Sequence, residues 1–103
     1  MSGSAILALD QGTTGSTALV VSQEGRVLSR AYSEFEQHVP RPGWVEHDAE
    51  EIWRVTTQVA REALDAPEVG HASVEAIGIT NQRETLVLWD RLTLNPVHRA
   101  IVW

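Results

Sequence analysis

A short segment near the N-terminus, LDQGTTG, combines a carboxylate with glycines and hydroxyl groups. Asp10 follows an apolar run, and Gly12, Thr13, Thr14 and Gly15 come just after it. Glycines let backbone N–H groups approach an anion closely, and the threonines add hydroxyl donors, so this loop could hold phosphate. Asp10 would repel phosphates unless a cation lay between them, which indicates Mg²⁺ bound through water. A plain β-turn uses the same residue types, and the residues alone support both interpretations.

A second polar segment, TNQRET at 80–85, lies between the apolar runs VEAIGI and LVLW. Arg83 offers a planar fork of donors and Glu84 offers two acceptor oxygens. A polyol needs both kinds of partner because each hydroxyl donates and accepts. Neighbours in a strand face opposite sides, so both side chains reach one ligand only if the backbone turns here. The alternative, which the local residues favour, is a hairpin turn with a solvated ion pair worth about 0–1 kcal/mol.

The composition excludes several classes of protein. The chain has 103 residues, of which 43% are hydrophobic, and these values predict one small folded domain. A net charge of −6 argues against binding to nucleic acids or anionic membranes. All eight basic residues are Arg and there is no Cys, which excludes a Walker-type phosphate loop, a disulfide and a thiolate nucleophile. The N-terminus has no basic region before its short apolar run, so we expect a cytoplasmic protein without a signal peptide.

The elements that must position these segments begin with a sheet. Three segments rich in apolar and β-forming residues, 5–9, 16–21 and 26–35, are joined by short turns, one of which is QEG at 23–25. Short turns join antiparallel neighbours, so these segments predict an antiparallel meander of three strands. VPRPGW at 39–44 contains two prolines and a glycine and predicts a loop.

A helix is expected after this loop. Asp48 is a typical N-cap residue, and Glu51 three residues later completes a capping-box pattern. Pro67 ends the helix because it cannot continue the backbone hydrogen bonds. One apolar face, suited to covering a sheet, is predicted by the three- and four-residue spacing of Ile52, Val55, Thr56, Val59, Ala60, Ala63 and Leu64.

Two more strands are expected at 74–79 and 85–90, and AIVW at 100–103 could begin another. After the helix, the chain can return parallel to the first strand by a right-handed crossover. The predicted fold class is therefore α/β. Because the last apolar run stops at Trp103, we expect an N-terminal fragment of a longer protein.

Four segments, LDQGTTGSTALV, PGWVEHD, AIGITNQRET and IVW, together resemble the FGGY carbohydrate kinase family, and within it the glycerol kinases. The match runs in order over about residues 6–103. DxGTT recurs across sugar kinases and their actin- and Hsp70-like relatives, whereas PGWVEHD with GITNQRET is far more specific. The resemblance implies a ribonuclease H-like fold in two lobes, of which residues 1–103 would be the first part of the N-terminal domain.

The resemblance also implies an activity, the ATP- and Mg²⁺-dependent phosphorylation of glycerol to sn-glycerol 3-phosphate in glycerol degradation, by an enzyme expected to be a homo-oligomer. The family's catalytic aspartate lies beyond residue 103, so we expect no kinase activity from this chain alone. The alternatives are a related kinase of another polyol or a ketose, and a non-catalytic fragment that self-associates. The roles implied for single residues are metal and phosphate binding for Asp10, phosphate contacts for Thr13 and Thr14, and glycerol contacts for Arg83, Glu84 and Trp103.

The chain departs from the family at two positions. Many glycerol kinases have Ser at Gly15 and Arg at Thr17. We therefore predict no nucleotide contact from Thr17, whereas Gly15 can still offer its backbone N–H. No metal role is predicted for the four histidines, because no two of them have a metal-ligand spacing on the same helix or strand. His47, next to the helix N-cap, is expected to be structural. The four are His38, His47, His71 and His98.

Overall fold

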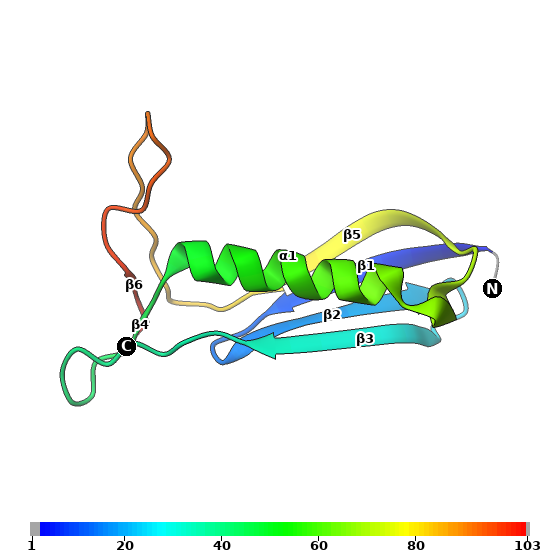
Figure 1. The fold of residues 1–103 in the computed structure, drawn as a ribbon, viewed down its shortest axis with the longest axis horizontal. Helices are drawn as coiled ribbons and strands as arrows, with labels where there is room; N and C mark the ends of the chain where they lie inside the picture. The colour runs from blue at the N-terminus through cyan, green and yellow to red at the C-terminus, as the bar shows by residue number, and fades with distance from the viewer. Residues whose placement is uncertain (1–2, 103) are drawn as a thin grey trace.

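The computed structural model describes residues 3–102 and forms an α/β fold with one long helix lying along a sheet (Figure 1). No helix of these described residues is long and apolar enough to cross a membrane. The elements in chain order are β1 (Ser4–Gln11), β2 (Gly15–Ser22), β3 (Val27–Glu34), β4 (Glu46–His47), α1 (Ala49–Asp65), the 3-10 helix η1 (Pro67–Val69), β5 (Ser73–Asn81) and β6 (Ala100–Ile101).

The main sheet has the strand order β3-β2-β1-β5. Strands β1, β2 and β3 form the predicted antiparallel meander, and β5 returns parallel to β1 as predicted. In the β1–β5 register, Asp10 lies opposite Thr80 and Gln11 opposite Asn81. The carboxyl ends of β1 and β5 therefore lie side by side at one edge of the sheet, and the segments that follow both strands start there.

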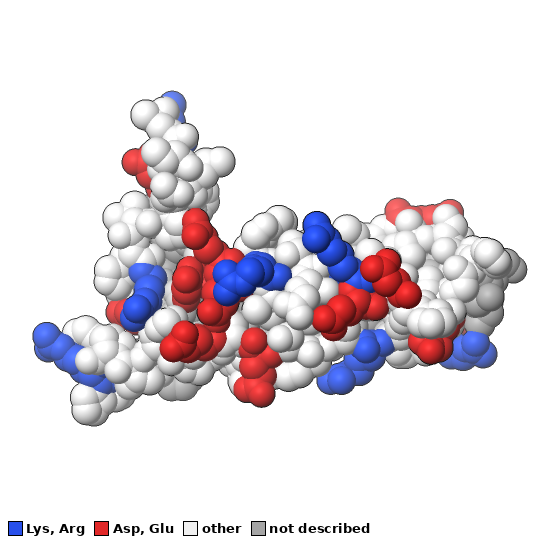
Figure 2. Space-filling view, viewed as in Figure 1, with Lys and Arg blue, Asp and Glu red and all other residues white. Residues whose placement is uncertain are grey.

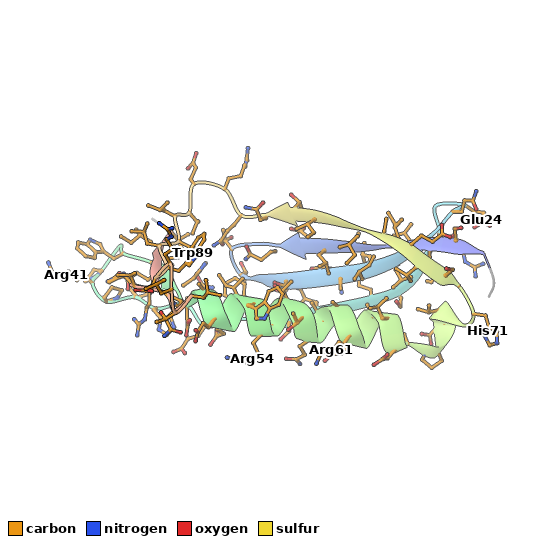
Figure 3. All side chains as sticks on the ribbon, turned by 90° about the horizontal axis from the view of Figure 1, so that it is seen from above. Glu24, Arg41, Arg54, Arg61, His71 and Trp89 are labelled. Atoms are coloured by element: carbon orange, nitrogen blue, oxygen red, sulfur yellow. The ribbon has the colours of Figure 1, made fainter. Side chains whose placement is uncertain are left out.

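One face of α1 covers the meander because its apolar residues recur every three or four positions. Val55, Val59 and Ala63 are buried on this face. Arg54 and Arg61 point away from the sheet on the opposite face (Figure 3). The main core consists of eight buried residues from the strands, α1 and η1, which are Ala5, Leu7, Ala18, Val20, Leu28, Val59, Ala63 and Val69.

The first turn of α1 is capped as predicted, but only in part. The Asp48 carboxylate accepts from Glu50 N at 2.9 Å, which confirms the N-cap. The capping box is wrong, because Glu51 does not turn back to Asp48. Its carboxylate accepts from the backbone N–H of Glu36, in the segment after β3, and pairs with Arg54 at 3.5 Å. Figure 2 shows acidic side chains gathered around this end of the helix, where they interact favourably with the positive end of its dipole.

The predicted strand at 85–90 is wrong. After β5 the chain leaves the sheet, and residues 86–99, here called the arm, extend away from it (Figure 1). Only isolated bridges remain, from Leu86 to Ile101 and from Trp89 to Pro96. The apolar run has strand-forming residues, but no neighbouring strand pairs along its length, and Leu86 is 68% exposed. The strand expected at 100–103 is the two-residue β6, which pairs with β4, while Trp103 lies outside the described residues.

Candidate functional site

The GTTG loop (residues 12–15) joins β1 to β2 at the sheet edge described above. Gly12 N donates to Gly15 O at 2.9 Å and closes the turn. Thr13 and Thr14 are exposed at its tip, so their hydroxyls can reach a ligand. Gly15 is buried, and a Cβ there would clash with the backbone carbonyl of Ser33 on β3. Glycine at position 15 is thus explained by the close approach of β3, a reason that the sequence does not reveal.

The carbonyl oxygens of the GTTG loop are already bound by protein donors. Gln37 Nε2 donates to Thr13 O at 3.0 Å, and Phe35 N donates to Thr14 O at 3.3 Å. In the same way the Gln11 side chain donates to Gly12 O at 2.7 Å. Carbonyl oxygens repel an anion, and their hydrogen bonds to protein donors reduce this repulsion. The threonine side chains, whose hydroxyls can donate to an anion, are exposed at the loop tip. The loop is therefore chemically suited to phosphate.

Asp10 is exposed near the end of β1, between Thr17 on β2 and Thr80 on β5. Within residues 3–102, no group of three or more His, Cys, Asp or Glu side chains could hold a metal ion. A single exposed carboxylate fits a Mg²⁺ ion that keeps most of its waters and takes further ligands from phosphate. It does not fit a metal held entirely by protein side chains.

The Arg–Glu turn (residues 82–85) begins where β5 ends, at Asn81. Glu84 has φ = 59°, in the left-handed region that non-glycine residues seldom adopt. This conformation supplies the change of backbone direction that Arg83 and Glu84 need to serve one ligand. Both side chains are exposed, and in the described part of the chain neither forms an ion pair. The backbone bends here, but no following strand pairs with β5, so the described residues form neither the hairpin nor the ion pair of the alternative interpretation.

A buried histidine lies between these two segments. His47 is 0% exposed, and its ring meets the Phe35 ring edge-on with centroids 4.8 Å apart. Its Nε2 contacts Gln37 Oε1 at 2.7 Å and its Nδ1 contacts Gln82 Nε2 at 3.2 Å. The ring packing and the two side-chain contacts of His47 are those of a residue that supports the surrounding structure, the role expected from its place beside the helix N-cap.

Burial lowers the pKa of His47 below 6.5, and the nearby His38 lowers it further. The hydrogen bond from Gln82 and the carboxylate of Glu51 act in the opposite direction and only partly offset this effect. His47 is therefore neutral at physiological pH. The sequence patterns predict a role for neither Gln37 nor Gln82. The signal for Gln82 is its place beside Arg83 in TNQRET, whereas Gln37 has no recognisable sequence signal.

The structure thus brings the GTTG loop, Asp10 and the Arg–Glu turn to one end of the sheet. Trp89 and Arg41 lie at this end of the molecule too, while Glu24 and His71 lie at the other (Figure 3). Ligand sites of α/β sheets with parallel strands are generally found beyond the carboxyl ends of those strands. Trp103, the remaining predicted contact, lies outside the described residues.

Comparison with known proteins identifies relatives over almost the whole chain. Residues 5–103 match the N-terminal domain of the FGGY family of carbohydrate kinases. The glycerol kinase of Rhodopirellula baltica is 53% identical over 103 residues, which are 100% of this chain and 19% of that protein. The glycerol kinase of Rhodospirillum centenum is 58% identical over 98 residues, 95% of this chain and 20% of that protein. The chain therefore spans about a fifth of the length of these relatives.

Solved structures show the same fold. A glycerol kinase of Plasmodium falciparum, crystallised with ADP, superposes with a TM-score of 0.91 at 35% identity. That match covers 99% of this chain and 21% of the other chain. A xylulose kinase of Brucella ovis gives a TM-score of 0.85 at 25% identity, over 96% of this chain and 20% of the other. The arrangement of strands and helix described above is thus shared with kinases of different substrates.

Proposed function

Because the chain belongs to the FGGY family of carbohydrate kinases, we propose that the whole protein transfers a phosphoryl group from ATP to glycerol and forms sn-glycerol 3-phosphate. The observation that carries this proposal is the meeting of the GTTG loop and the Arg–Glu turn, which follow two adjacent parallel strands. Phosphoryl transfer depends mainly on positioning and on neutralising charge, and two segments at one sheet edge can position two substrates.

The GTTG loop binds the nucleotide phosphates in this proposal. The hydroxyls of Thr13 and Thr14 and backbone N–H groups at the loop tip donate to phosphate oxygens, while the loop carbonyls stay bound to protein donors. Asp10 would hold Mg²⁺ through water. When bound, the cation would offset the negative charge of the phosphates and of Asp10 itself.

The Arg–Glu turn binds glycerol in this proposal. Arg83 donates to hydroxyl oxygens and Glu84 accepts from hydroxyl protons, so the pair distinguishes a polyol from an apolar ligand. Trp103 packs against the glycerol carbons. The base that takes the proton of the reacting hydroxyl lies outside residues 1–103, and these residues alone are therefore expected to have no kinase activity.

Isothermal titration of the whole protein with glycerol tests the proposal. Arg83→Ala should weaken glycerol binding by about tenfold or more, because a charge-assisted hydrogen bond is worth about 1.5–3 kcal/mol. Arg91→Ala, an equal change on the exposed arm, is the matched control and should bind as wild type. Equal affinities of wild type and Arg83→Ala would refute the role of Arg83, and phosphorylation of xylulose in place of glycerol would assign the protein to another substrate.

The nucleotide half of the site has its own test. Gly12→Val should abolish ATP binding, because the side chain would crowd a loop in which even a Cβ at position 12 lies 3.3 Å from Gly15 O. The fold should stay intact. Unchanged ATP affinity in this variant would overturn the assignment of the loop.

We also propose that the whole protein is a cytoplasmic homo-oligomer. Light scattering after size-exclusion chromatography would measure its mass with and without substrates. A non-catalytic protein that self-associates would instead show a mass that rises with concentration and no binding of glycerol or ATP.

A further inference from the structure

A continuous set of polar contacts joins the two segments of the proposed site. It begins at Thr13 O in the GTTG loop, which accepts from Gln37 Nε2 at 3.0 Å. Gln37 Oε1 then contacts His47 Nε2 at 2.7 Å, and His47 Nδ1 contacts Gln82 Nε2 at 3.2 Å. Gln82 precedes Arg83 in the chain and belongs to the Arg–Glu turn. Three side chains therefore span from one candidate substrate segment to the other.

The direction of each hydrogen bond in this set is determined. Gln37 Nε2 faces two carbonyl oxygens, Thr13 O at 3.0 Å and Phe35 O at 3.4 Å, so it must be the amide nitrogen. Its oxygen then faces His47, whose Nε2 must carry the proton and donate. The other ring nitrogen of His47 is left as an acceptor for the amide of Gln82. The neutral tautomer with hydrogen on Nε2 satisfies every contact along the set.

The centre of the set is buried and packed. His47 is fully buried and lies in β4, whose pairing with β6 places it opposite Ala100. The edge-on contact with Phe35, with 79° between the rings, fixes the ring plane. Gln82 Oε1 is buried without a hydrogen-bond partner in the part of the chain that the structure describes. The contact with His47 Nδ1 therefore orients the side-chain amide of Gln82, although the amide oxygen accepts no hydrogen bond.

We propose that Gln37, His47 and Gln82 are positioning residues that hold the GTTG loop and the Arg–Glu turn in a fixed mutual arrangement for phosphoryl transfer. This inference rests on the proposed function, because it concerns the alignment of the two substrates that these segments bind. None of the three residues needs to touch a substrate. Loss of the contacts lets the two segments move relative to each other, and small misplacements of reacting groups reduce the rate steeply.

The test uses the whole protein with Gln37→Met, Gln82→Met and the double variant. Methionine has nearly the length of glutamine but cannot form these hydrogen bonds, and both positions lie outside the fully buried centre. Each single variant should lower kcat by about tenfold or more, with KM for glycerol and ATP changed by less than about threefold. The double variant should be no slower than the worse single variant, because the contacts act as one unit. Gln58→Met, which loses only a contact to Glu62 on the outer face of α1, is the matched control and should keep the wild-type kcat.

Amide hydrogen exchange gives a second readout that does not require turnover. Gln82→Met should speed exchange in the GTTG loop, because the only side-chain link between residue 82 and that loop in the described structure runs through His47 and Gln37. Unchanged kcat in both single variants, additive losses in the double variant, or unchanged loop exchange would overturn the proposal. Wild-type protein that does not phosphorylate glycerol would refute the proposed function instead, and loop exchange would then still decide whether the three side chains couple the segments.

Discussion

The left-handed backbone of Glu84 predicts that stability and substrate binding oppose each other at this residue. A non-glycine residue in this region costs roughly 1–2 kcal/mol, and Glu84 has φ = 59°. Glu84→Gly removes that cost but gives the unfolded chain more freedom, worth about 0.4–1 kcal/mol. The difference predicts a protein more stable by between about zero and about 1.6 kcal/mol. Glu84→Gln keeps the Cβ and hence the strain, so its stability should stay within about 0.5 kcal/mol of wild type.

Both variants should bind glycerol more weakly, because each removes the carboxylate. Replacing a charge-assisted hydrogen bond by a neutral one costs about 1 kcal/mol, and losing it altogether costs about 1.5–3 kcal/mol. Titration calorimetry should therefore show a larger loss of affinity for Glu84→Gly than for Glu84→Gln. Thermal unfolding should show that Glu84→Gly, the weaker binder, is the more stable of the two variants.

Leu94→Gly is the matched control for the backbone term. Leu94 also has a left-handed backbone, with φ = 64°, but it lies in the arm and has no proposed role in binding. This variant should gain stability like Glu84→Gly and keep wild-type affinity for glycerol. A clear loss of stability in Glu84→Gly, or wild-type glycerol affinity in both Glu84 variants, would refute the reasoning.

Three further outcomes depend on contacts around α1, and urea unfolding at several pH values measures all of them. Burial lowers the pKa of His47, so below about pH 6.5 the unfolded chain binds a proton that the folded chain does not. The free energy of unfolding should therefore not depend on His47 above this pH and should fall as the pH drops below it, and His47→Gln should flatten this slope. Asp48→Ala should cost about 1 kcal/mol through loss of the N-cap. Ser29→Ala should cost about 1–3 kcal/mol because the buried carbonyl of Ala63 loses its donor at 2.6 Å, and Pro67, four residues on, has no N–H to replace it. Ser33→Ala on the same strand loses only a 3.4 Å surface contact and should cost less than about 0.5 kcal/mol, so equal losses in the two serine variants would contradict this account.

Local patterns predict most of the fold because the responsible interactions lie close together in the chain. Short turns impose the meander, and the spacing of Val55, Val59 and Ala63 imposes the buried helix face. The same logic fails at residues 85–90, because a strand also needs a partner strand, and strand-forming residues alone do not supply one. It fails again at Glu51, whose carboxylate binds the backbone of Glu36, a residue 15 positions away.

For the site, the sequence by itself determined the chemistry. The glycines and hydroxyls of residues 12–15 suit phosphate, and the adjacent Arg83 and Glu84 suit hydroxyls, because these properties belong to the residue types. Only the tertiary structure decided that the two segments meet, because the parallel pairing of β1 and β5 joins residues about 70 positions apart in the chain. It also decided that His47 links them, since its hydrogen bonds reach 10 residues back to Gln37 and 35 residues forward to Gln82. No local pattern encodes contacts of that range, which arise only when the chain closes around a buried side chain.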